Sequence, residues 1–422
     1  MQHVIIGNGP AGVIAAETIR KHKPQDRIIL VGDEHEPPYS RMAIPYLLHG
    51  NINETGTHLR KKDDHFAALK IEQVVGRVKR LDSAARKVEL EDGSTLTFDK
   101  ILLATGSVPA RPPIPGIDSP GVHNCWTLAD ARKIMASARK GTRVLQMGAG
   151  FIGCIILEAL TVRGVQLTVV EMGERMVPRM MGEGAGNMIR RWCESKGITV
   201  HTGARVDAIT PIPGSGALRV TLSNGSALEV DVIISATGVK PNIGFLKDSG
   251  VACATGILVD PGMQTAVAGV YAAGDCAEAF DPATGKTVVS AIQPNAAEQA
   301  RCAGLNMAGH PTVQRGVTQI NVLDTLGLIS TSFGQWEGVA GGQRAELTDH
   351  DAYKYIRLEF DGDLLVGANT IGLTEHVGVL RGLIESKVRL GPWKDYLLVD
   401  PFRLSEAYIG CTQKQDAWQA AA

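Results

Sequence analysis

Closely spaced cysteine pairs are missing from this sequence. The seven cysteines lie far apart, with no CxxC or CxxxxC pair among them, at Cys125, Cys154, Cys193, Cys253, Cys276, Cys302 and Cys411. This spacing argues against a local redox disulfide, a contiguous iron–sulfur motif and a zinc knuckle. An odd number of cysteines, without a signal peptide at the start, favours a reducing, cytoplasmic location.

Long apolar runs and an excess of one charge are missing as well. No apolar stretch reaches the roughly 20 residues that span a bilayer. The 43 basic and 44 acidic side chains are interspersed and leave a formal net charge of −1, which is not the pattern of a nucleic-acid binder. His35, His49 and His65 lack the spacing of metal ligands. We therefore expect a soluble protein with no metal site and no membrane or nucleic-acid partner.

Glycine, by contrast, is abundant, with 48 residues in a chain of 422, where the usual share is about 7%. A chain of this length predicts about two or three domains. The apolar run 3–7 is followed by a helical pattern from Pro10 to Lys21 and by a second apolar run at 27–32. Because the same order returns between Arg143 and Glu171, the sequence predicts two βαβ units.

A second repeat supports this duplication. The segments VELEDGSTLTFDKILLATG (residues 88–106) and VTLSNGSALEVDVIISATG (residues 220–238) match at a constant offset of 132 residues. Asp92-Gly93 and Asn224-Gly225 supply the positive φ angles of tight hairpin turns. Each βαβ unit is therefore expected to continue into a β-meander and a short strand that ends in Ala-Thr-Gly.

These repeats predict an α/β fold with two nested Rossmann-like dinucleotide-binding domains. The first is expected to resume after the second, because the strand-rich segment 256–276 needs a sheet to join. From about residue 316, β-runs joined through Asp361-Gly362 predict a C-terminal mixed α/β interface domain, and the last dozen residues are expected to be weakly structured. The expected boundaries are 1–115 with 242–316, then 116–241, then 317–422.

The first glycine loop, Gly7-Asn8-Gly9-Pro10-Ala11-Gly12, has the pattern GxGxxG between a strand and a helix. Its glycines permit a tight turn, close approach of the backbone to a pyrophosphate, and close packing of helix on sheet. The helix N-terminus then offers free N–H groups to the phosphates. Asp33 lies 21 residues beyond Gly12, where a carboxylate accepts hydrogen bonds from ribose hydroxyls.

The second loop, Gly148-Ala149-Gly150-Phe151-Ile152-Gly153, repeats this pattern, with Glu171 at the end of the following strand. A carboxylate there binds the free 2′-hydroxyl of NADH and repels the 2′-phosphate of NADPH. The sequence thus favours NADH, although Arg175 lies close enough to weaken that preference. One GxGxxG alone is more often an ordinary glycine turn, but two, each with strand, helix and distal acid, favour two dinucleotide sites.

Over residues 1–310 the chain resembles the pyridine-nucleotide-disulfide reductase superfamily, in particular its rubredoxin reductase, ferredoxin reductase and nitrite-reductase flavin-domain branches. Ala104-Thr105-Gly106-Ser107 and Ala236-Thr237-Gly238 are similar to the family's paired crossover segments. The stretch VYAAGD, ending in Gly274-Asp275, is similar to its second flavin signature, and PNAAEQAR at 294–301 resembles the start of the helix directed at the flavin pyrimidine. The resemblance implies that the first domain binds FAD and the second binds NADH.

The resemblance also implies roles for single residues. Asp275 would hydrogen-bond the FAD ribityl chain, and the helix N-terminus with Gln293 and Asn295 would stabilise negative charge near flavin N1. Val78 would contact adenine through its backbone, and Arg41 would border the isoalloxazine, with a solvated surface charge as an equal alternative. The expected FAD-binding residues are Gly7, Gly9, Pro10, Ala11, Gly12, Asp33, Glu34, Arg41, Val78, Ala104, Thr105, Gly106, Gly274, Asp275, Gln293, Pro294 and Asn295. The expected NADH-binding residues are Gly148, Gly150, Phe151, Ile152, Gly153, Glu171, Arg175 and Gly238.

Three positions depart from the family's pattern. Met42 stands where disulfide reductases carry a CxxxxC pair and flavin-dependent oxidases a single cysteine, so electrons cannot pass through a thiol there. Pro45-Tyr46 replaces the Ser-Lys of ferredoxin and rubredoxin reductases. Ile155 stands where the family often has a glutamate.

Together these features predict an FAD-dependent oxidoreductase that passes hydride from NADH to FAD without a catalytic side chain. Its electrons would go on to an external electron-transfer protein such as rubredoxin, ferredoxin or an iron–sulfur subunit. An NADH oxidase, or a reductase of oxygen or sulfur species, is an alternative that the missing cysteine at position 42 weakens. A redox-sensing flavoprotein that mainly binds a partner is a third hypothesis. A homodimer follows by analogy only.

Overall fold

The computed structural model describes residues 1–317, 319–375 and 377–413. The chain forms two compact units, Met1–Pro109 with Val239–Thr318 and Ala110–Gly238 with Gln319–Ala422. The C-terminal domain thus groups with the second βαβ domain. Most of the last dozen residues, which the sequence predicts to be weakly structured, lie outside the described part of the chain. Among the described residues, no helix has the length and apolar character needed to cross a membrane.

The first unit is built on a five-stranded parallel sheet in the order β19-β7-β1-β2-β3. Its strands are β1 (Gln2–Ile6), β2 (Arg27–Gly32), β3 (Ile71–Val75), β7 (Lys100–Leu103) and β19 (Val270–Ala272). The central strands are buried along nearly their whole length, because a parallel sheet covered on both faces needs continuous apolar runs. Strand β19 comes from the segment after the second domain and pairs with β7, so the first domain does resume there.

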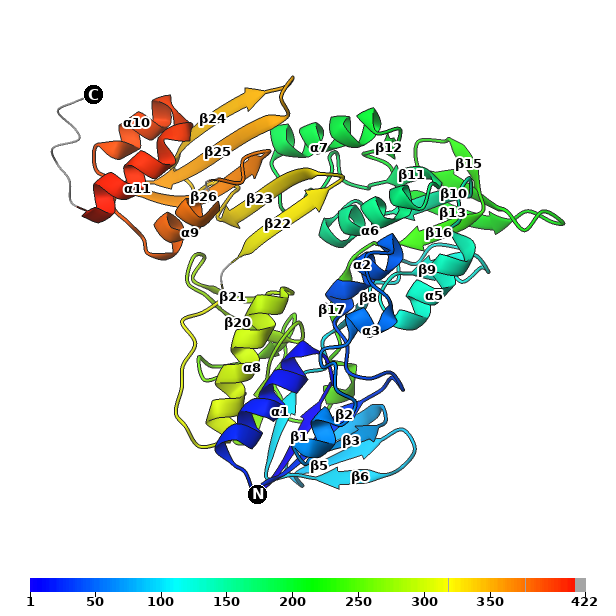
Figure 1. Ribbon diagram of the computed structural model, residues 1–422, viewed down its shortest axis with the longest axis vertical. Helices are drawn as coiled ribbons and strands as arrows, with labels where there is room; N and C mark the ends of the chain where they lie inside the picture. The colour runs from blue at the N-terminus through cyan, green and yellow to red at the C-terminus, as the bar shows by residue number, and fades with distance from the viewer. Residues whose placement is uncertain (318, 376, 414–422) are drawn as a thin grey trace. The chain divides into compact units, whose positions relative to one another are not determined.

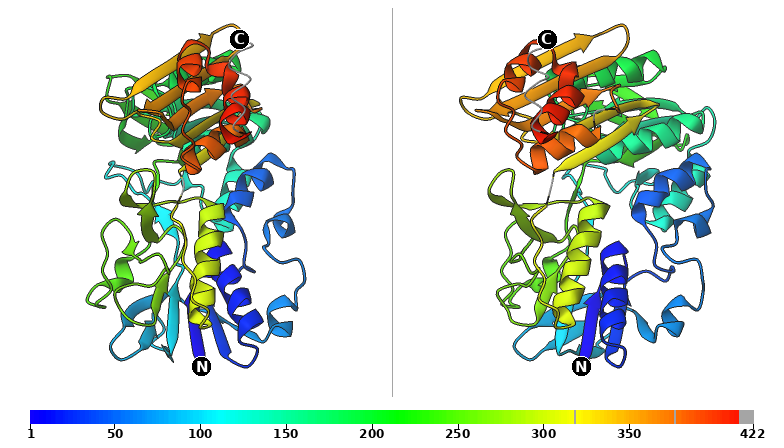
Figure 2. Two further views of the ribbon diagram at one scale, coloured as in Figure 1. Left: turned by 90° about the vertical axis from the view of Figure 1, so that its left-hand side faces the viewer. Right: turned by 60° about the vertical axis from the view of Figure 1, so that its left-hand side comes forward.

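Two helices pack together beside this sheet, α1 (Pro10–His22) and α8 (Gln293–Met307). They lie side by side in all three ribbon views (Figures 1 and 2). Gly304 of α8 permits the close approach, because a β-carbon there would lie 3.1 Å from the carbonyl oxygen of Ala15 and 3.0 Å from Cβ of Thr18. This packing places the N-termini of α1 and α8 near each other.

Smaller elements complete the first unit. An antiparallel sheet contains β4 (Val78–Asp82), β5 (Lys87–Leu90) and β6 (Thr95–Thr97). Two further sheets contain β8 (Ser107–Pro109) with β17 (Val239–Pro241), and β18 (Ile257–Leu258) with β20 (Ala277–Asp281) and β21 (Lys286–Val289). The short helices are η1 (Arg41–Ala43), α2 (Ile44–His49), α3 (Glu54–Thr57), α4 (His65–Ala68) and η2 (Gly244–Leu246).

The second unit repeats this design in residues 110–238. Its parallel sheet has the order β12-β11-β10-β16-β9. The strands are β9 (Val122–Asn124), β10 (Arg143–Met147), β11 (Gln166–Val170), β12 (Thr199–His201) and β16 (Val232–Ser235). The helices are α5 (Leu128–Ser137), α6 (Phe151–Val162) and α7 (Glu183–Ser195), and the meander is β13 (Val206–Pro211), β14 (Leu218–Leu222) and β15 (Ala227–Val230).

The two hairpin turns match in detail. Gly93 has φ +85° and Gly225 has φ +82°, a conformation that glycine adopts without strain. The side chain before each glycine accepts the same local hydrogen bond, from Ser94 N–H to Asp92 and from Ser226 N–H to Asn224. The fold class predicted from the repeat, two Rossmann-like domains with β-meanders and a C-terminal mixed domain, is therefore confirmed.

The C-terminal domain is a five-stranded antiparallel sheet in the order β22-β23-β26-β25-β24, with helices packed on it. Its elements are β22 (Ile320–Thr325), β23 (Leu328–Gly334), β24 (Gln343–Asp349), β25 (Lys354–Asp361), β26 (Leu364–Ile371), α9 (Val377–Glu385), α10 (Trp393–Val399), η3 (Pro401–Arg403) and α11 (Leu404–Gln413). Ile356, Leu358 and Phe360 of β25 belong to the apolar core that includes these helices. Because strand residues alternate between faces, Arg357 and Glu359 lie on the opposite face.

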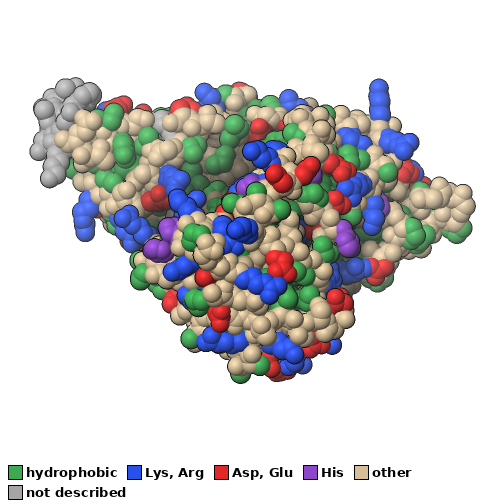
Figure 3. All heavy atoms as spheres, turned by 60° about the horizontal axis from the view of Figure 1, so that its bottom comes forward, with side chains coloured by type: hydrophobic (Ala, Val, Ile, Leu, Met, Phe, Trp, Pro, Cys, Tyr) green, Lys and Arg blue, Asp and Glu red, His purple; other side chains and the backbone are tan. Residues whose placement is uncertain are grey.

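Charges of both signs are mixed on the molecular surface. On the face drawn in Figure 3, Lys and Arg side chains alternate with Asp and Glu, with no large area of one sign. This distribution agrees with the near-zero net charge of the chain.

Candidate cofactor sites

The first glycine loop joins β1 to α1 in a turn that only glycines can make. Gly7 has φ +108°, and a β-carbon there would collide with the carbonyl of Ala104. A β-carbon at Gly12 would collide with the carbonyl of Gly7. Gly9 is the N-cap of α1 and has no side-chain cap, while the space beside its α-carbon is open. The free N–H groups of the first turn thus form a cradle that fits a pyrophosphate.

The end of β19 meets this loop. A β-carbon at Gly274 would lie 3.3 Å from Cβ of Ala11 and 3.6 Å from Cβ of Ala296 in α8. Buried Gln299 fixes the meeting point, since its Oε1 accepts the Gly274 N–H at 2.8 Å. The structure therefore brings together three segments that the sequence assigns to FAD binding.

Asp275, the next residue, is a half-buried carboxylate. Burial raises its pKa, while a hydrogen bond from the hydroxyl of Ser107 at 2.8 Å and the charge of Arg41 partly oppose that rise. Such a carboxylate gains from further hydrogen-bond donors. The hydroxyl groups of a ribityl chain would be suitable donors. Neither Ser107 nor Gln299 is among the residues predicted from the sequence, although both are polar residues inside the flavin-like motifs.

The segment Tyr39-Ser40-Arg41 contacts the first residue of α8. The Ser40 hydroxyl donates to Oε1 of Gln293 at 2.6 Å. Glu34 accepts hydrogen bonds from the Tyr39 hydroxyl at 2.8 Å and from Arg41 Nη2 at 2.9 Å. Arg41 is therefore paired through Glu34 rather than simply solvated.

Other predicted FAD residues are held by local hydrogen bonds. Nδ2 of Asn295, in the first turn of α8 with Pro294, donates to the Ser290 hydroxyl at 2.7 Å. The Thr105 hydroxyl, between Ala104 and Gly106, donates to the carbonyl of Asn242 at 2.8 Å. Both bonds fix backbone close to the candidate site.

Asp33 follows β2, at the edge where the adenosine half of a dinucleotide is expected. Its Oδ2 accepts a hydrogen bond from Arg77 Nη2 at 3.0 Å. Because Arg77 directly precedes Val78, this ion pair brings the backbone at Val78 close to Asp33. The two residues predicted for the ribose and the adenine therefore lie on neighbouring segments.

The second glycine loop repeats the first between β10 and α6. Gly148 has φ +96°, and a β-carbon at Gly153 would crowd the carbonyl of Gly148. Gly150 is the N-cap of α6, again without a side-chain cap, so the N–H groups of Phe151 and Ile152 stay available in the first turn. The predicted NADH loop thus has the same cradle as the FAD loop.

Glu171 and Arg175 have different tasks beside this loop. The carboxylate of Glu171 accepts the N–H groups of Ala149 at 2.7 Å and Gly173 at 2.8 Å. Arg175 donates through Nε to the carbonyl of Met181 at 2.7 Å and through Nη2 to that of Pro178 at 3.2 Å. Since these bonds hold Arg175 within its own loop, it is poorly placed to recruit a 2′-phosphate.

Gly238 lies in the crossover between β16 and β17, with φ +106°. Its carbonyl accepts the N–H of Ala110 at 2.8 Å, and the hydroxyl of Thr237 donates to the Ala110 carbonyl at 3.2 Å. The glycine thus belongs to a fixed backbone crossing within the second unit. Among the described residues, a β-carbon at Gly238 would meet only Nη1 of Arg179, at 4.0 Å.

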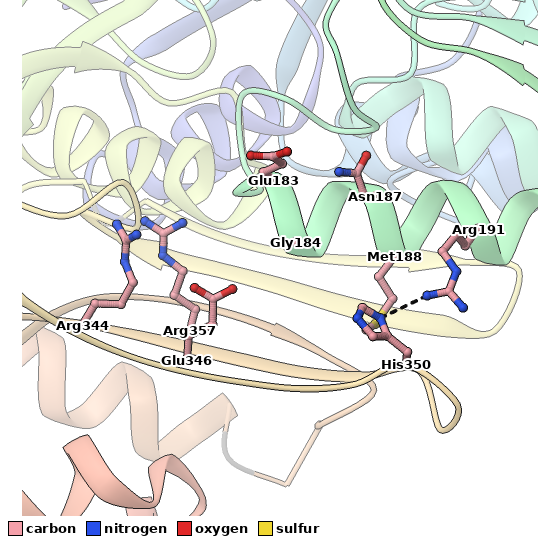
Figure 4. A pocket seen from close by; sticks show the side chains of 9 residues that line it. All are labelled: Glu183, Gly184, Asn187, Met188, Arg191, Arg344, Glu346, His350 and Arg357. Atoms are coloured by element: carbon pink, nitrogen blue, oxygen red, sulfur yellow. Dashed lines mark hydrogen bonds between the residues drawn. The ribbon is translucent and has the colours of Figure 1, made fainter.

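A separate cavity of about 390 Å³ lies between α7 and the C-terminal sheet. Figure 4 shows Arg344, Arg357 and Glu346 rising side by side from the sheet toward α7. Nε of Arg344 and Nε of Arg357 donate to one oxygen of buried Glu359, at 2.6 Å and 2.5 Å. Arg191 donates to Nδ1 of His350 at 3.0 Å. Charged groups of this cavity therefore bind one another, and the cavity is distinct from both glycine loops.

The thiols offer no redox pair. Met42 lies in η1 with 47% of its surface exposed. All seven cysteines are free, and only Cys253 is classed as exposed. Burial raises the pKa of Cys125 to about 12 and that of Cys193 to about 12, so these thiols are unreactive near neutral pH.

Comparisons with known proteins agree with this geometry. The family model of pyridine nucleotide-disulphide oxidoreductases matches residues 1–301. Subunit epsilon of the NADH-dependent phenylglyoxylate dehydrogenase of Aromatoleum evansii is 34% identical over 418 residues, 97% of this chain and 98% of the relative. An NADH oxidase of Methanocaldococcus jannaschii is 32% identical over 349 residues, 79% and 77% of the two chains.

Solved structures show the same fold over nearly the whole chain. The structure of a covalent putidaredoxin reductase–putidaredoxin complex matches with a TM-score of 0.89 at 22% identity, covering 97% of this chain and 99% of the other. An NAD-dependent persulfide reductase from A. fulgidus matches with a TM-score of 0.84 at 27% identity, covering 93% and 78%. FAD and NADH are the cofactors of this group, and both glycine cradles fit them. The chain belongs to the pyridine nucleotide-disulphide oxidoreductase family, as a flavoprotein oxidoreductase.

Proposed function

We propose that this protein oxidises NADH and passes the electrons to a separate electron-carrying protein or subunit. In this proposal the first unit holds FAD and residues 110–238 hold NADH, through the residues expected from the sequence. Two glycine cradles of the same geometry, each followed by an acid after the next strand, support two dinucleotide sites. Bound FAD would accept two electrons as hydride and release them singly.

One observation carries the proposal of an external acceptor. Met42 stands in the segment that borders the candidate flavin site, where a thioether cannot form a disulfide or a sulfenic acid. The remaining thiols are scattered, and most are buried. Electrons that enter therefore need an acceptor outside this chain. One relative that matches along almost its full length is named as subunit epsilon of an NADH-dependent phenylglyoxylate dehydrogenase, which supports a protein acceptor.

In this proposal the side chains of the site hold the backbone around the cofactors and bind the cofactors, without taking part in the chemistry. Gln299 and Ser107 hold the Gly274-Asp275 turn, and Ser40 binds Gln293 at the start of α8. The α8 N-terminus offers N–H groups and a partial positive charge that stabilise an anion nearby. No general base is required, so changes to these residues should act on cofactor retention and potential rather than on a protonation step.

A second candidate is an NADH oxidase or a small-molecule reductase. The NADH oxidase relative from M. jannaschii and the structural likeness to a persulfide reductase favour it. Chemistry of this kind would have to proceed at the flavin itself, because position 42 has no thiol.

The proposal also covers cellular location and oligomeric state. We propose a cytoplasmic protein, because the seven free cysteines suit a reducing compartment. A homodimer through the C-terminal sheet is proposed by analogy with the family only.

Anaerobic stopped-flow absorbance of the holoprotein tests the proposal. Mixing with NADH should bleach the flavin, and a second mix should restore it rapidly with rubredoxin or ferredoxin but slowly with air. Rapid reoxidation by air alone would support the oxidase instead, and a flavin that NADH leaves oxidised would contradict both. Pretreatment with N-ethylmaleimide serves as the thiol control, and we expect it to leave both half-reactions unchanged.

A further inference from the structure

A polar side chain lies inside the central strand of the second parallel sheet. Gln146 of β10 is fully buried, with Leu145 and Met147 as buried apolar neighbours on the same strand. Strands β11 and β16 pair on either side. A buried amide without partners costs free energy, so a glutamine here requires a specific reason.

The partners of this amide are the two ends of the NADH loop. Nε2 of Gln146 donates to the carbonyl of Gly148 and to the carbonyl of Gly153, each at 2.9 Å. A single side chain therefore links the first and last glycines of the GxGxxG loop. Its Oε1 is buried and has no hydrogen-bond partner. The side chain thus provides hydrogen bonds to two loop carbonyls while its own acceptor stays unpaired.

The first glycine loop forms without such a brace. Ile5 occupies the matching position, two residues before Gly7, and its Cγ2 lies 3.3 Å from where a β-carbon of Gly12 would be. Both loops make the same backbone bonds otherwise, from Gly7 to Val31 and from Gly148 to Val170. The glutamine is therefore not needed to build this kind of turn.

The other groups of the second loop are also held. The Ala149 N–H is bound by Glu171, and the Ala149 carbonyl accepts the N–H of Val177 at 2.8 Å. With Gln146 holding the carbonyls of Gly148 and Gly153, the carbonyl oxygens at both ends of the loop are drawn away from the cradle. The N–H groups at the start of α6 then face it without competition.

We propose that Gln146 is a positioning residue for NADH, because it holds the loop in the conformation that binds the pyrophosphate. This inference rests on the proposed function, because it assumes that NADH binds at this loop. Loss of the amide would free the carbonyl of Gly148 to turn toward the cradle, where it would repel a pyrophosphate. The cost would appear in NADH affinity and not in the later transfer of electrons.

The test uses the FAD-loaded protein and a Gln146→Met variant, which keeps the side-chain length but removes the donor. Loss of hydrogen bonds worth roughly 1–3 kcal/mol corresponds to a NAD⁺ dissociation constant raised about 5- to 150-fold. KM for NADH should rise in parallel, while kcat and FAD content stay near wild type. Gln299→Met, in which the buried glutamine beside the FAD loop is replaced, is the matched control, and it should lower FAD retention instead.

A NAD⁺ affinity unchanged in Gln146→Met, with only the melting temperature lowered, would overturn the inference. A wild-type protein that retains FAD but does not bind NAD⁺ would instead overturn the proposed function. If Gln146→Met does not fold, Gln146→Glu decides, because a protonated carboxyl can donate one of the two bonds. Its NAD⁺ affinity should then fall as the pH rises, and an affinity equal to wild type at every pH would contradict the proposal.

Discussion

The carboxylate of Glu171 accepts a hydrogen bond of 2.7 Å from the backbone N–H of Ala149, the second residue of the second glycine loop. Its other oxygen accepts the N–H of Gly173 at 2.8 Å. The acid is thus oriented before any ligand arrives, and it ties the end of β11 to the pyrophosphate cradle. A carboxylate has about four acceptor positions, so these two bonds leave room for ribose hydroxyls.

Replacing Glu171 should weaken NADH binding and relax the preference over NADPH. In Glu171→Gln the negative charge that repels a 2′-phosphate is lost, and the amide cannot accept as many hydrogen bonds. We expect KM for NADH to rise roughly tenfold, the effect of one good hydrogen bond, and the NADH/NADPH ratio of kcat/KM to fall. Glu174→Gln, an exposed neighbour, is the control and should match wild type. An unchanged ratio in Glu171→Gln would place the ribose elsewhere.

The two glycine loops should lose different cofactors when a methyl group is added. A β-carbon at Gly12 or Gly153 meets the carbonyl of the first glycine of its own loop, and strain of this kind costs about 1–3 kcal/mol. Gly12→Ala should therefore be purified with much less FAD. Gly153→Ala should keep FAD but bind NAD⁺ about 5- to 150-fold more weakly. Flavin absorbance and calorimetric titration measure the two effects, and a variant with the opposite loss would reverse the assignment of the units.

Much of this architecture can be predicted from the sequence because it depends on local rules. Gly7 and Gly148 mark strand-to-helix turns, and the repeated hairpins at Gly93 and Gly225 follow from dipeptides that favour positive φ. These signals lie within short segments, so a single sequence reveals them. The grouping of residues 319–413 with the second unit does not follow from such a rule.

The missed residues act through contacts across long sequence separations. Ser107 binds Asp275 and Ser40 binds Gln293. Ser107 lies in a segment that resembles the family's crossover, but nothing near either serine in the chain indicates which distant residue it binds. Gln146 did carry a signal, a polar residue within an apolar run, but its partners were not apparent without coordinates. Met42 is a different case, because it matters through the thiol that this position lacks, and that can be read from the sequence alone.

Acid should destabilise the protein partly through Glu17. Burial alone would raise its pKa, but hydrogen bonds from Arg60 and His65 outweigh that effect and lower the pKa below the ordinary value of 4.5. A lowered folded-state pKa stabilises the fold above the unfolded value, and this contribution is lost as pH falls through the folded value. The melting temperature of Glu17→Gln should therefore lie below wild type at pH 7 and approach it below about pH 4.

An exposed carboxylate provides the comparison for Glu17. Asp63→Asn removes a charge from a nearby exposed side chain, and its melting curve should follow wild type across the same pH range. A constant difference between Glu17→Gln and wild type from pH 7 to pH 3 would show that packing, and not titration, explains the effect.

The cavity between α7 and the C-terminal sheet should depend on one buried carboxylate. Glu359 is 4% exposed and binds Nε of both Arg344 and Arg357. Its replacement by glutamine would remove the carboxylate that binds both guanidinium groups, a change that costs about 3 kcal/mol or more. Thermal unfolding of Glu359→Gln should therefore shift downward by roughly 6–12 °C. Asp351→Asn, an exposed change nearby, should have no such effect.

The two arginines of this cluster should differ in the same assay. The Arg344 side chain is 46% exposed and that of Arg357 is 11% exposed, so water can replace the first ion pair far more easily than the second. Arg344→Gln should lower the melting temperature by less than half as much as Arg357→Gln. Equal losses from both would mean that the pairing with Glu359 does not determine how much each arginine stabilises the contact between the C-terminal sheet and α7.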